Sequence, residues 1–226
     1  MSDFLAFFIR FFPDLMRGAG ITLVLTAQGL VAGFVLGLLA AYARVYGSKF
    51  WRGLAVGYIE LFRGTPLLMQ LFIIYYGLPG LGITLSRELS AFLALGFNSG
   101  AYQAEYLRGS ILAIGDGQMM AGRAIGMSRF KVIWYIILPQ ALRLAIPAWS
   151  NEPVSLLKST AVVFLIAVPE LMAKAKSIAA QTYDPIGSYL AVAIVYLAIV
   201  YLLDAALRWL ERASRIPGFE IEGKKA

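Results

Sequence analysis

The sequence predicts an all-α integral membrane protein with about five transmembrane helices. Of its 226 residues 60% are hydrophobic, and the mean hydropathy is +0.73. Only 15% of residues are charged, against roughly 25% in ordinary soluble domains. The apolar residues form solid runs, which suit helices of about 20 residues that cross a bilayer, whereas barrel strands would alternate apolar and polar residues. We therefore expect one transmembrane domain, residues 1–226.

The N-terminal segment, residues 1–17, predicts a short helix that lies in the membrane interface. Four phenylalanines and Leu15 recur at helical spacing, and most charged residues lie off that stripe. Pro13 predicts that this helix is bent or brief. Asp3 stands where a cleaved signal peptide would carry basic residues, so we expect no such peptide.

Five apolar runs are the predicted spans. They cover residues 18–43, about 54–76, about 89–107, 144 to about 168 and about 185–203. The first run carries Gly29, Gly33 and Gly37, a repeated pattern of small residues that lets another helix approach closely. We expect this glycine face to pack against a neighbouring span.

Lysine and arginine counts predict the orientation in the membrane. Thirteen of these residues fall between the first two spans, in the segment 108–143 or in the tail from about 208–226, and only five fall on the other side. Basic loops remain in the cytoplasm. The N-terminus is then outside and the C-terminus cytoplasmic.

Residues 109–140 form the long connection between the third and fourth predicted spans. The stretch from Gly117 to Arg143, which covers most of it, has four basic residues and no acidic one. Gly122 and Gly126 allow either a close backbone approach or a sharp turn, and Pro139 predicts that the next short helix does not continue unbroken. A short cytoplasmic helix with an apolar face either lies on the membrane or fits a groove on a partner.

The spacing of Gly117-Gln118, Ala121, Gly126 and Leu138-Pro139 resembles the coupling-loop signature of permease subunits in bacterial ABC importers. Three more stretches resemble the branch of that family that serves histidine, glutamine, arginine, other polar amino acids and opines. They are ELFRGTPLLMQ at 60–70 followed by YGLP at 76–79, GAYQAEYLRG at 100–109, and LPQA at 138–141 continuing through Asn151-Glu152 to Leu157-Lys158-Ser159. Together they cover about residues 18–212.

The resemblance implies a type I ABC importer permease (MetI-like) fold in the bacterial inner membrane, with a coupling helix that sits in a cleft of an ATPase subunit. The residues that it assigns to ATPase coupling are Met120, Ala121, Gly122, Arg123, Gly126, Leu138 and Pro139. Met120 stands where the family carries glutamate, and Gly122 where it carries alanine. Coupling then depends on apolar fit and Gly126, or on a different partner permease that keeps the glutamate, and this favours a heteromeric pair.

Polar residues inside the predicted spans are candidates for the substrate pathway, since a charge at the centre of a membrane helix costs roughly 2.5–3.5 kcal/mol. These candidates are Glu105, Asn151, Glu152, Lys158 and Ser159. An amino acid zwitterion needs one anionic and one cationic partner, which Glu152 and Lys158 could supply. The alternatives are a structural Glu152–Lys158 network and a local Glu105–Arg108 pair. Many relatives place an aspartate where Ser159 stands.

A second polar group lies within the second predicted span. It comprises Glu60, Arg63, Gly64, Thr65 and Pro66. Glu60 and Arg63 are three residues apart and could form an ion pair on one helix. Alternatively, Gly64-Thr65-Pro66 is a kink near the pathway that moves during gating.

The expected partners follow from what the chain lacks. No G-x-x-x-x-G-K-S/T phosphate loop occurs, so we expect no enzyme activity and no cofactor on this chain, with ATP and Mg bound by a separate ATPase. The chain has no histidine and no cysteine, so we expect no metal site. The other expected partners are a second permease subunit, a periplasmic or extracellular substrate-binding protein and membrane lipid, but not nucleic acid.

Two other classes of function remain. A secondary transporter or channel driven by an ion gradient could use Glu105, Glu152 and Lys158 as its ion site. Such a carrier has no need of a glycine-punctuated cytoplasmic helix at a set distance from Leu-Pro. An intramembrane enzyme is the weaker alternative, because the chain has no histidine, cysteine or paired catalytic carboxylates.

Overall fold

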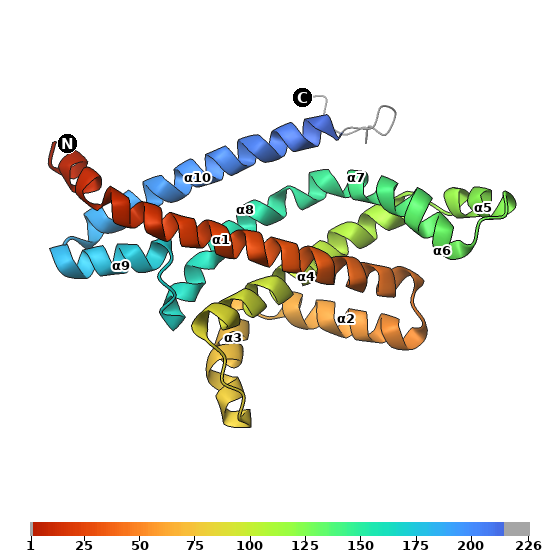
Figure 1. Ribbon diagram of the computed structural model, residues 1–226, viewed down its shortest axis with the longest axis horizontal. Helices are drawn as coiled ribbons and strands as arrows, with labels where there is room; N and C mark the ends of the chain where they lie inside the picture. The colour runs from red at the N-terminus through yellow and green to blue at the C-terminus, as the bar shows by residue number, and fades with distance from the viewer. Residues whose placement is uncertain (1, 215–226) are drawn as a thin grey trace.

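The computed structural model describes residues 2–214, which form a bundle of helices with no strand among them (Figure 1). The α-helices are α1 (Ser2–Tyr46), α2 (Lys49–Gly64), α3 (Leu67–Phe72), α4 (Arg87–Ala113), α5 (Gly117–Ala124), α6 (Arg129–Val132), α7 (Leu138–Trp149), α8 (Asn151–Ser159), α9 (Leu171–Thr182) and α10 (Pro185–Ala213). Two π-helical turns, Ile73–Gly77 and Ile133–Ile137, and two 3-10 turns, Leu78–Leu81 and Thr160–Ile166, extend them. The expected tail therefore begins inside α10, and its residues 215–226 lie outside the described part.

Helix α1 is one continuous helix that includes Pro13. The expected separate helix over residues 1–17 is therefore wrong. Phe11 and Leu15 are buried in an apolar cluster with residues of α9 and α10, so the N-terminal segment packs on protein. We attribute its continuity to this packing, which offsets the hydrogen bond that a proline removes from a helix.

Helix α4 crosses α1 near the middle of the molecule (Figure 1). A Cβ on Gly33 would lie 2.9 Å from the backbone nitrogen of Gly100, and a Cβ on Gly37 would lie 3.0 Å from its carbonyl oxygen. Both distances are too short for a side chain, so only glycine allows the two backbones to come this close. The predicted packing face on the first span is confirmed.

The second predicted span is bent rather than straight. Helix α2 ends at Gly64, and the helical segment 67–81 leaves it at an angle of 106°. Pro66 has no N–H to continue the ladder. The amide of Gln70 donates instead to the carbonyl oxygens of Phe62 (2.8 Å) and Thr65 (3.0 Å). The expected kink at Gly64-Thr65-Pro66 is present, as a hydrogen-bonded elbow.

The expected interruption at Pro139 is present only as a change of helix type. The chain is helical from Arg129 to Trp149, so the helix begins before the predicted start of the fourth span at 144. The turn Ile133–Ile137 is π-helical, and Pro139 follows it within the first turn of α7. A π-turn widens the helix, and we attribute the continuity to the room that it leaves for the proline ring.

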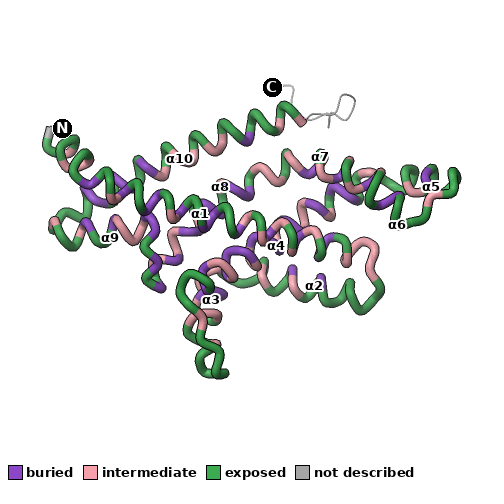
Figure 2. Tube along the Cα trace, in the orientation of Figure 1, coloured by how far each residue is buried: buried purple, intermediate pink, exposed green. Residues whose placement is uncertain are grey.

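Three helices in the described part are long and apolar enough to cross a membrane, namely 3–46, 129–149 and 185–213, and up to five if each bent pair is one span. The bent pairs are 49–64 with 67–81 and 151–166 with 171–182. Helix α4, a predicted span, is not among these five. Helix α4 lies between other helices, and its polar residues Ser90, Ser99, Gln103 and Ser110 are buried. Helix α10, in contrast, is exposed along much of its length (Figure 2).

Candidate coupling and translocation site

Helix α5 projects at one end of the molecule, beside α6 (Figure 1). Ala121 and Arg123 are exposed on it, and Met120 is 66% exposed. Gly122 faces the other way, and a Cβ there would lie 2.6 Å from Cγ2 of Val132 on α6. The predicted coupling helix thus presents an apolar and basic outer surface while its inner side packs against the next helix.

Gly126 ends α5 in the left-handed conformation, with φ of +84°. The N–H of Gly126 donates to the carbonyl of Arg123 (3.0 Å), and the N–H of Met127 donates to that of Gly122 (3.0 Å). This pair of bonds is the Schellman arrangement, which favours glycine at this position. Nothing lies within 4 Å of a Cβ placed on Gly126, so its role is the turn and not a close approach.

The structure gives the predicted coupling loop narrower bounds than residues 109–140. Helix α4 continues to Ala113, and α6 begins at Arg129 after Ser128, whose hydroxyl accepts from the N–H of Lys131 (3.3 Å). Leu138 and Pro139 therefore do not close the loop. They lie further along the same helical run.

A cavity of about 470 Å³ lies between the α2–α3 elbow, α4 and α8. It is lined by Arg63, Gly64, Thr65, Pro66, Leu67, Asn98, Tyr102, Tyr106, Glu152, Ser155, Leu156 and Ser159. The cavity therefore brings together the predicted kink and two predicted pathway residues, Glu152 and Ser159, which are almost 90 positions further along the sequence. We name it the elbow cavity.

Glu152 is almost completely buried at the wall of the elbow cavity and belongs to a hydrogen-bonded chain that joins four helices. Its Oε1 accepts from the hydroxyl of Ser99 (2.7 Å), which also accepts from the amide of Gln103 (2.9 Å). That amide also donates to the carbonyl of Leu30 (3.1 Å), and the Gln103 oxygen accepts from the indole of Trp149 (2.8 Å). The carboxylate is therefore held in place by α4.

Three of the five predicted pathway residues lie outside the elbow cavity, namely Glu105, Asn151 and Lys158. Asn151 and Lys158 are exposed. The expected Glu152–Lys158 partnership is wrong, because positions six apart on a helix point to different sides. Arg63 is the basic side chain that lines this cavity.

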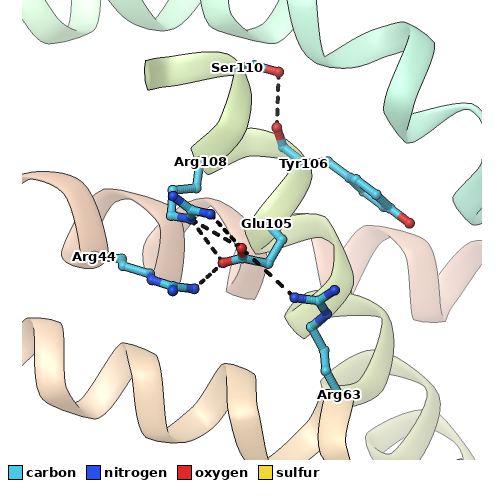
Figure 3. A network of polar contacts seen from close by, with 6 residues as sticks. All are labelled: Arg44, Arg63, Glu105, Tyr106, Arg108 and Ser110. Carbon is cyan, nitrogen blue, oxygen red and sulfur yellow. Dashed lines mark hydrogen bonds and ion pairs between the residues drawn. The ribbon is translucent and has the colours of Figure 1, made fainter. Parts of the chain in front are cut away.

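Glu105 lies at the centre of a cluster of three arginines from three helices (Figure 3). Arg44 of α1 donates to Oε1, and Arg108 of α4 reaches both oxygens, the closest contact being 2.8 Å. Arg63 of α2 stands 3.9 Å from Oε2. The expected Glu105–Arg108 pair is confirmed, but the expected Glu60–Arg63 pair is wrong, because Arg63 faces Glu105 and Glu60 is exposed.

Three residues of α4 that line the elbow cavity were not among the predicted site residues, namely Asn98, Tyr102 and Tyr106. They are spaced by four residues, so they share one face of the helix. That polar stripe inside a predicted span was the available signal. Among the described residues, no three acidic side chains gather in a way that could hold a metal ion.

Comparison with known proteins identifies relatives along nearly the whole chain. Residues 33–216 match the family described as "Binding-protein-dependent transport system inner membrane component". The glutamine transport system permease protein GlnP of Escherichia coli (strain K12) is 38% identical over 206 residues, which cover 90% of this chain and 94% of that protein. The nopaline transport system permease protein NocM of Agrobacterium fabrum (strain C58 / ATCC 33970) is 37% identical over 206 residues, covering 87% and 86%.

A solved structure also matches. It is described as "Crystal structure of an amino acid ABC transporter with histidines". The two chains superpose with a TM-score of 0.86 and 34% sequence identity, over 94% of this chain and 99% of that one. The expected permease fold is confirmed.

Proposed function

The chain belongs to the family of binding-protein-dependent transport system inner membrane components, and from this premise we propose that it is the permease subunit of an ATP-driven importer of polar amino acids or opines. It provides the path across the membrane and carries out no covalent chemistry. A separate ATPase binds ATP and Mg, and a substrate-binding protein delivers the substrate. This chain binds no cofactor.

The observation that carries the substrate class is the elbow cavity, where Glu152 and Arg63 both line the wall. An amino acid zwitterion has an ammonium group for the first and a carboxylate for the second. Arg63 is well suited to this role, because Arg44 and Arg108 already satisfy Glu105 and leave Arg63 only a long contact with it. The tyrosines and Asn98 add neutral hydrogen-bonding groups to the same wall.

Coupling to the ATPase is proposed for the outer surface of α5, where Met120 is exposed. Since Gly122 packs directly on Val132, a displacement of α5 moves α6 with it, and α6 continues into α7. The ATPase thereby shifts the population between inward- and outward-facing arrangements of the helices. Because Met120 replaces the glutamate of the family pattern, we propose that the second permease is a paralogue that retains this glutamate.

The proposed orientation places α5 and the α1–α2 connection in the cytoplasm and α9 outside. Both cytoplasmic segments lie at one end of the molecule in Figure 1, and α9 lies at the other. Arg123 lies in α5, and Lys49 and Arg129 begin the neighbouring helices α2 and α6. The positive-inside rule assigns that end to the cytoplasm.

Uptake into proteoliposomes tests the proposed mechanism. The permease is reconstituted with candidate ATPase and paralogous permease subunits, and uptake of labelled glutamine and histidine is measured with ATP and binding protein. We expect uptake to need both and to be lost with Met120→Arg, because it places a positive charge on the docking surface where the family pattern carries glutamate. Gln118→Arg adds the same charge to the side of α5 nearer Gly122 and should retain activity.

Uptake driven by an ion gradient would contradict the proposed ATP-driven import. If uptake proceeds with a proton or sodium gradient and without ATP, the chain is a secondary transporter and the proposed coupling fails. If Met120→Arg and Gln118→Arg behave alike, α5 does not dock through Met120.

The proposed role of the elbow cavity in substrate binding can be tested separately. In the working importer, Arg63→Gln and Glu152→Gln should each reduce uptake at least about tenfold, the loss expected when a charged hydrogen bond to substrate is removed. Lys158→Gln removes a positive charge from α8 outside the elbow cavity and should leave uptake unchanged. Equal losses in Arg63→Gln and Lys158→Gln would contradict the proposed site.

A further inference from the structure

A second cavity, of about 390 Å³, lies beside α5 at the end of the molecule opposite α9. Its polar lining includes Arg123, Arg129 and Asp116, so two guanidinium groups face one carboxylate. The guanidinium of Arg129 lies over the ring of Tyr46, 5.7 Å from its centroid. The excess of positive charge favours an anion in this basic cavity.

An apolar groove of about 200 Å³ adjoins the basic cavity. The two share Tyr46, Ile111 and Ile137 as lining residues. The groove is lined only by aliphatic and aromatic side chains, and Leu39 and Trp134 are partly exposed along it. A ligand that fills both spaces needs an anionic group at one end and a hydrocarbon chain at the other.

The boundary between the two spaces lies at the expected edge of the membrane. Tyr46 is the last residue of one helix that is able to span a membrane, and Arg129 is the first residue of another. Tyrosine and tryptophan side chains are favoured at this depth because they have an apolar ring and a polar edge. Tyr46 and Trp134 are therefore placed as residues of a lipid interface would be.

The groove also opens away from the elbow cavity. On α4, Tyr102 lines the elbow cavity and Ile111 lines the groove. They are nine residues apart, which at about 100° per residue places them on opposite sides of the helix. A groove on this side faces lipid when the elbow cavity faces the substrate path.

We propose that the basic cavity and the apolar groove together bind one anionic phospholipid of the cytoplasmic leaflet. Its phosphate lies between Arg123 and Arg129, and an acyl chain follows the groove past Ile111 and Ile137. A free phosphate would leave the groove without an occupant, and a neutral lipid would leave the arginines without an anion. Because Arg123 belongs to α5, the lipid joins the coupling helix to the edge of the membrane.

Native mass spectrometry of the full chain, purified in detergent, tests this proposal. Phosphatidylglycerol and phosphatidylcholine with the same acyl chains are compared at equal concentrations. We expect phosphatidylglycerol to be retained preferentially, and Arg129→Gln to weaken its retention about fivefold, the effect of one basic residue near an anionic lipid surface. Lys131→Gln removes the same charge two residues away, outside both cavities, and should retain the preference.

A second pair of variants tests the groove. Leu39→Trp fills the apolar space and should reduce retention of both lipids. Val35→Trp adds the same side chain one turn earlier on α1, outside the groove, and should not. Both positions are exposed, so neither variant should disturb folding.

Three results would overturn the proposal. The first is equal retention of the two lipids by the wild type, or equal effects of Arg129→Gln and Lys131→Gln. The second is full competition by soluble glycerol phosphate at concentrations matched to the lipid, which would make the site a phosphate site. The third is loss of ATPase binding in Arg129→Gln with lipid retention unchanged, which would make the ATPase the occupant.

Discussion

At the scale of single residues, two glycines only four positions apart in the predicted coupling loop have different physical roles. Gly126 is required by its backbone conformation, with φ of +84° and open space around it, whereas Gly122 is required by its neighbour Val132. The sequence left a turn and a close approach as alternatives for both. Only coordinates separate them, because one role depends on φ and the other on a side chain ten residues away.

The role of Gly122 yields the first prediction. Although the family pattern carries alanine there, Gly122→Ala should destabilise this protein by about 1–3 kcal/mol, because an added methyl group would clash with Val132 in a packed contact. The measurement is the thermal stability of the purified permease. Gly117→Ala, in the same helix with nothing within 4 Å of the added atom, is the matched control and should be neutral or slightly stabilising.

Val132→Ala provides a further check on that contact. It should offset much of the cost of Gly122→Ala, so that the double variant is more stable than the sum of the single effects predicts. Strict additivity of the two substitutions would show that the contact with Val132 is not the cause.

At the scale of elements, the α2–α3 elbow is held by side-chain hydrogen bonds. The Gln70 amide donates to two backbone carbonyls and to the hydroxyl of Thr65 (2.9 Å), and its oxygen accepts from Asn98 (3.1 Å). These bonds satisfy the polar groups that a broken helix would otherwise leave without partners in the membrane. The bend is therefore a fixed feature of this arrangement, with Asn98 connecting it to α4.

The elbow gives the second prediction. Gln70→Leu keeps the approximate volume but leaves the Phe62 carbonyl with fewer donors, and it should cost about 1–3 kcal/mol and lower the melting temperature. Gln181→Leu, which removes an exposed glutamine bonded only to Ser177 in the described structure, should have little effect. A normal melting temperature for Gln70→Leu would mean that Pro66 alone maintains the bend.

At the scale of the whole molecule, the Glu105 cluster joins α1, α2 and α4 through one carboxylate (Figure 3). Glu105→Gln would leave Arg44, Arg63 and Arg108 close together without their shared anion. We expect a loss of roughly 1.5–3 kcal/mol, the range for hydrogen bonds to charged groups. Glu60→Gln is the matched control on an exposed side chain, and equal melting temperatures for the two variants would show that the cluster does not join the helices.

The proposed orientation of the chain in the membrane can be tested by labelling introduced cysteines. The chain has no cysteine, so single-cysteine variants have no background. A membrane-impermeant maleimide should label Gln181→Cys in intact spheroplasts, and Lys49→Cys and Gln118→Cys only after permeabilisation. The reverse pattern, or labelling of all three from one side, would contradict an external α9.

The sequence by itself determined the class, the family resemblance and the positions of the elbow and of the short helix α5. These depend on apolar runs, on Pro66 and on short motifs, all of which act locally along the chain. It did not show that other helices cover α4, because this depends on how the polar residues of α4 pack and not on the apolar run that located the helix.

Only the tertiary structure decided which charges meet. Arg63 was predicted to pair with Glu60, its neighbour in sequence, but it lies beside Glu105 and lines a cavity with Glu152. Lys158, close to Glu152 in sequence, points elsewhere. Partners in a helical membrane protein are chosen by how the helices pack, and Gly33, Gly37 and Gly100 bring α1 and α4 close enough to make that choice.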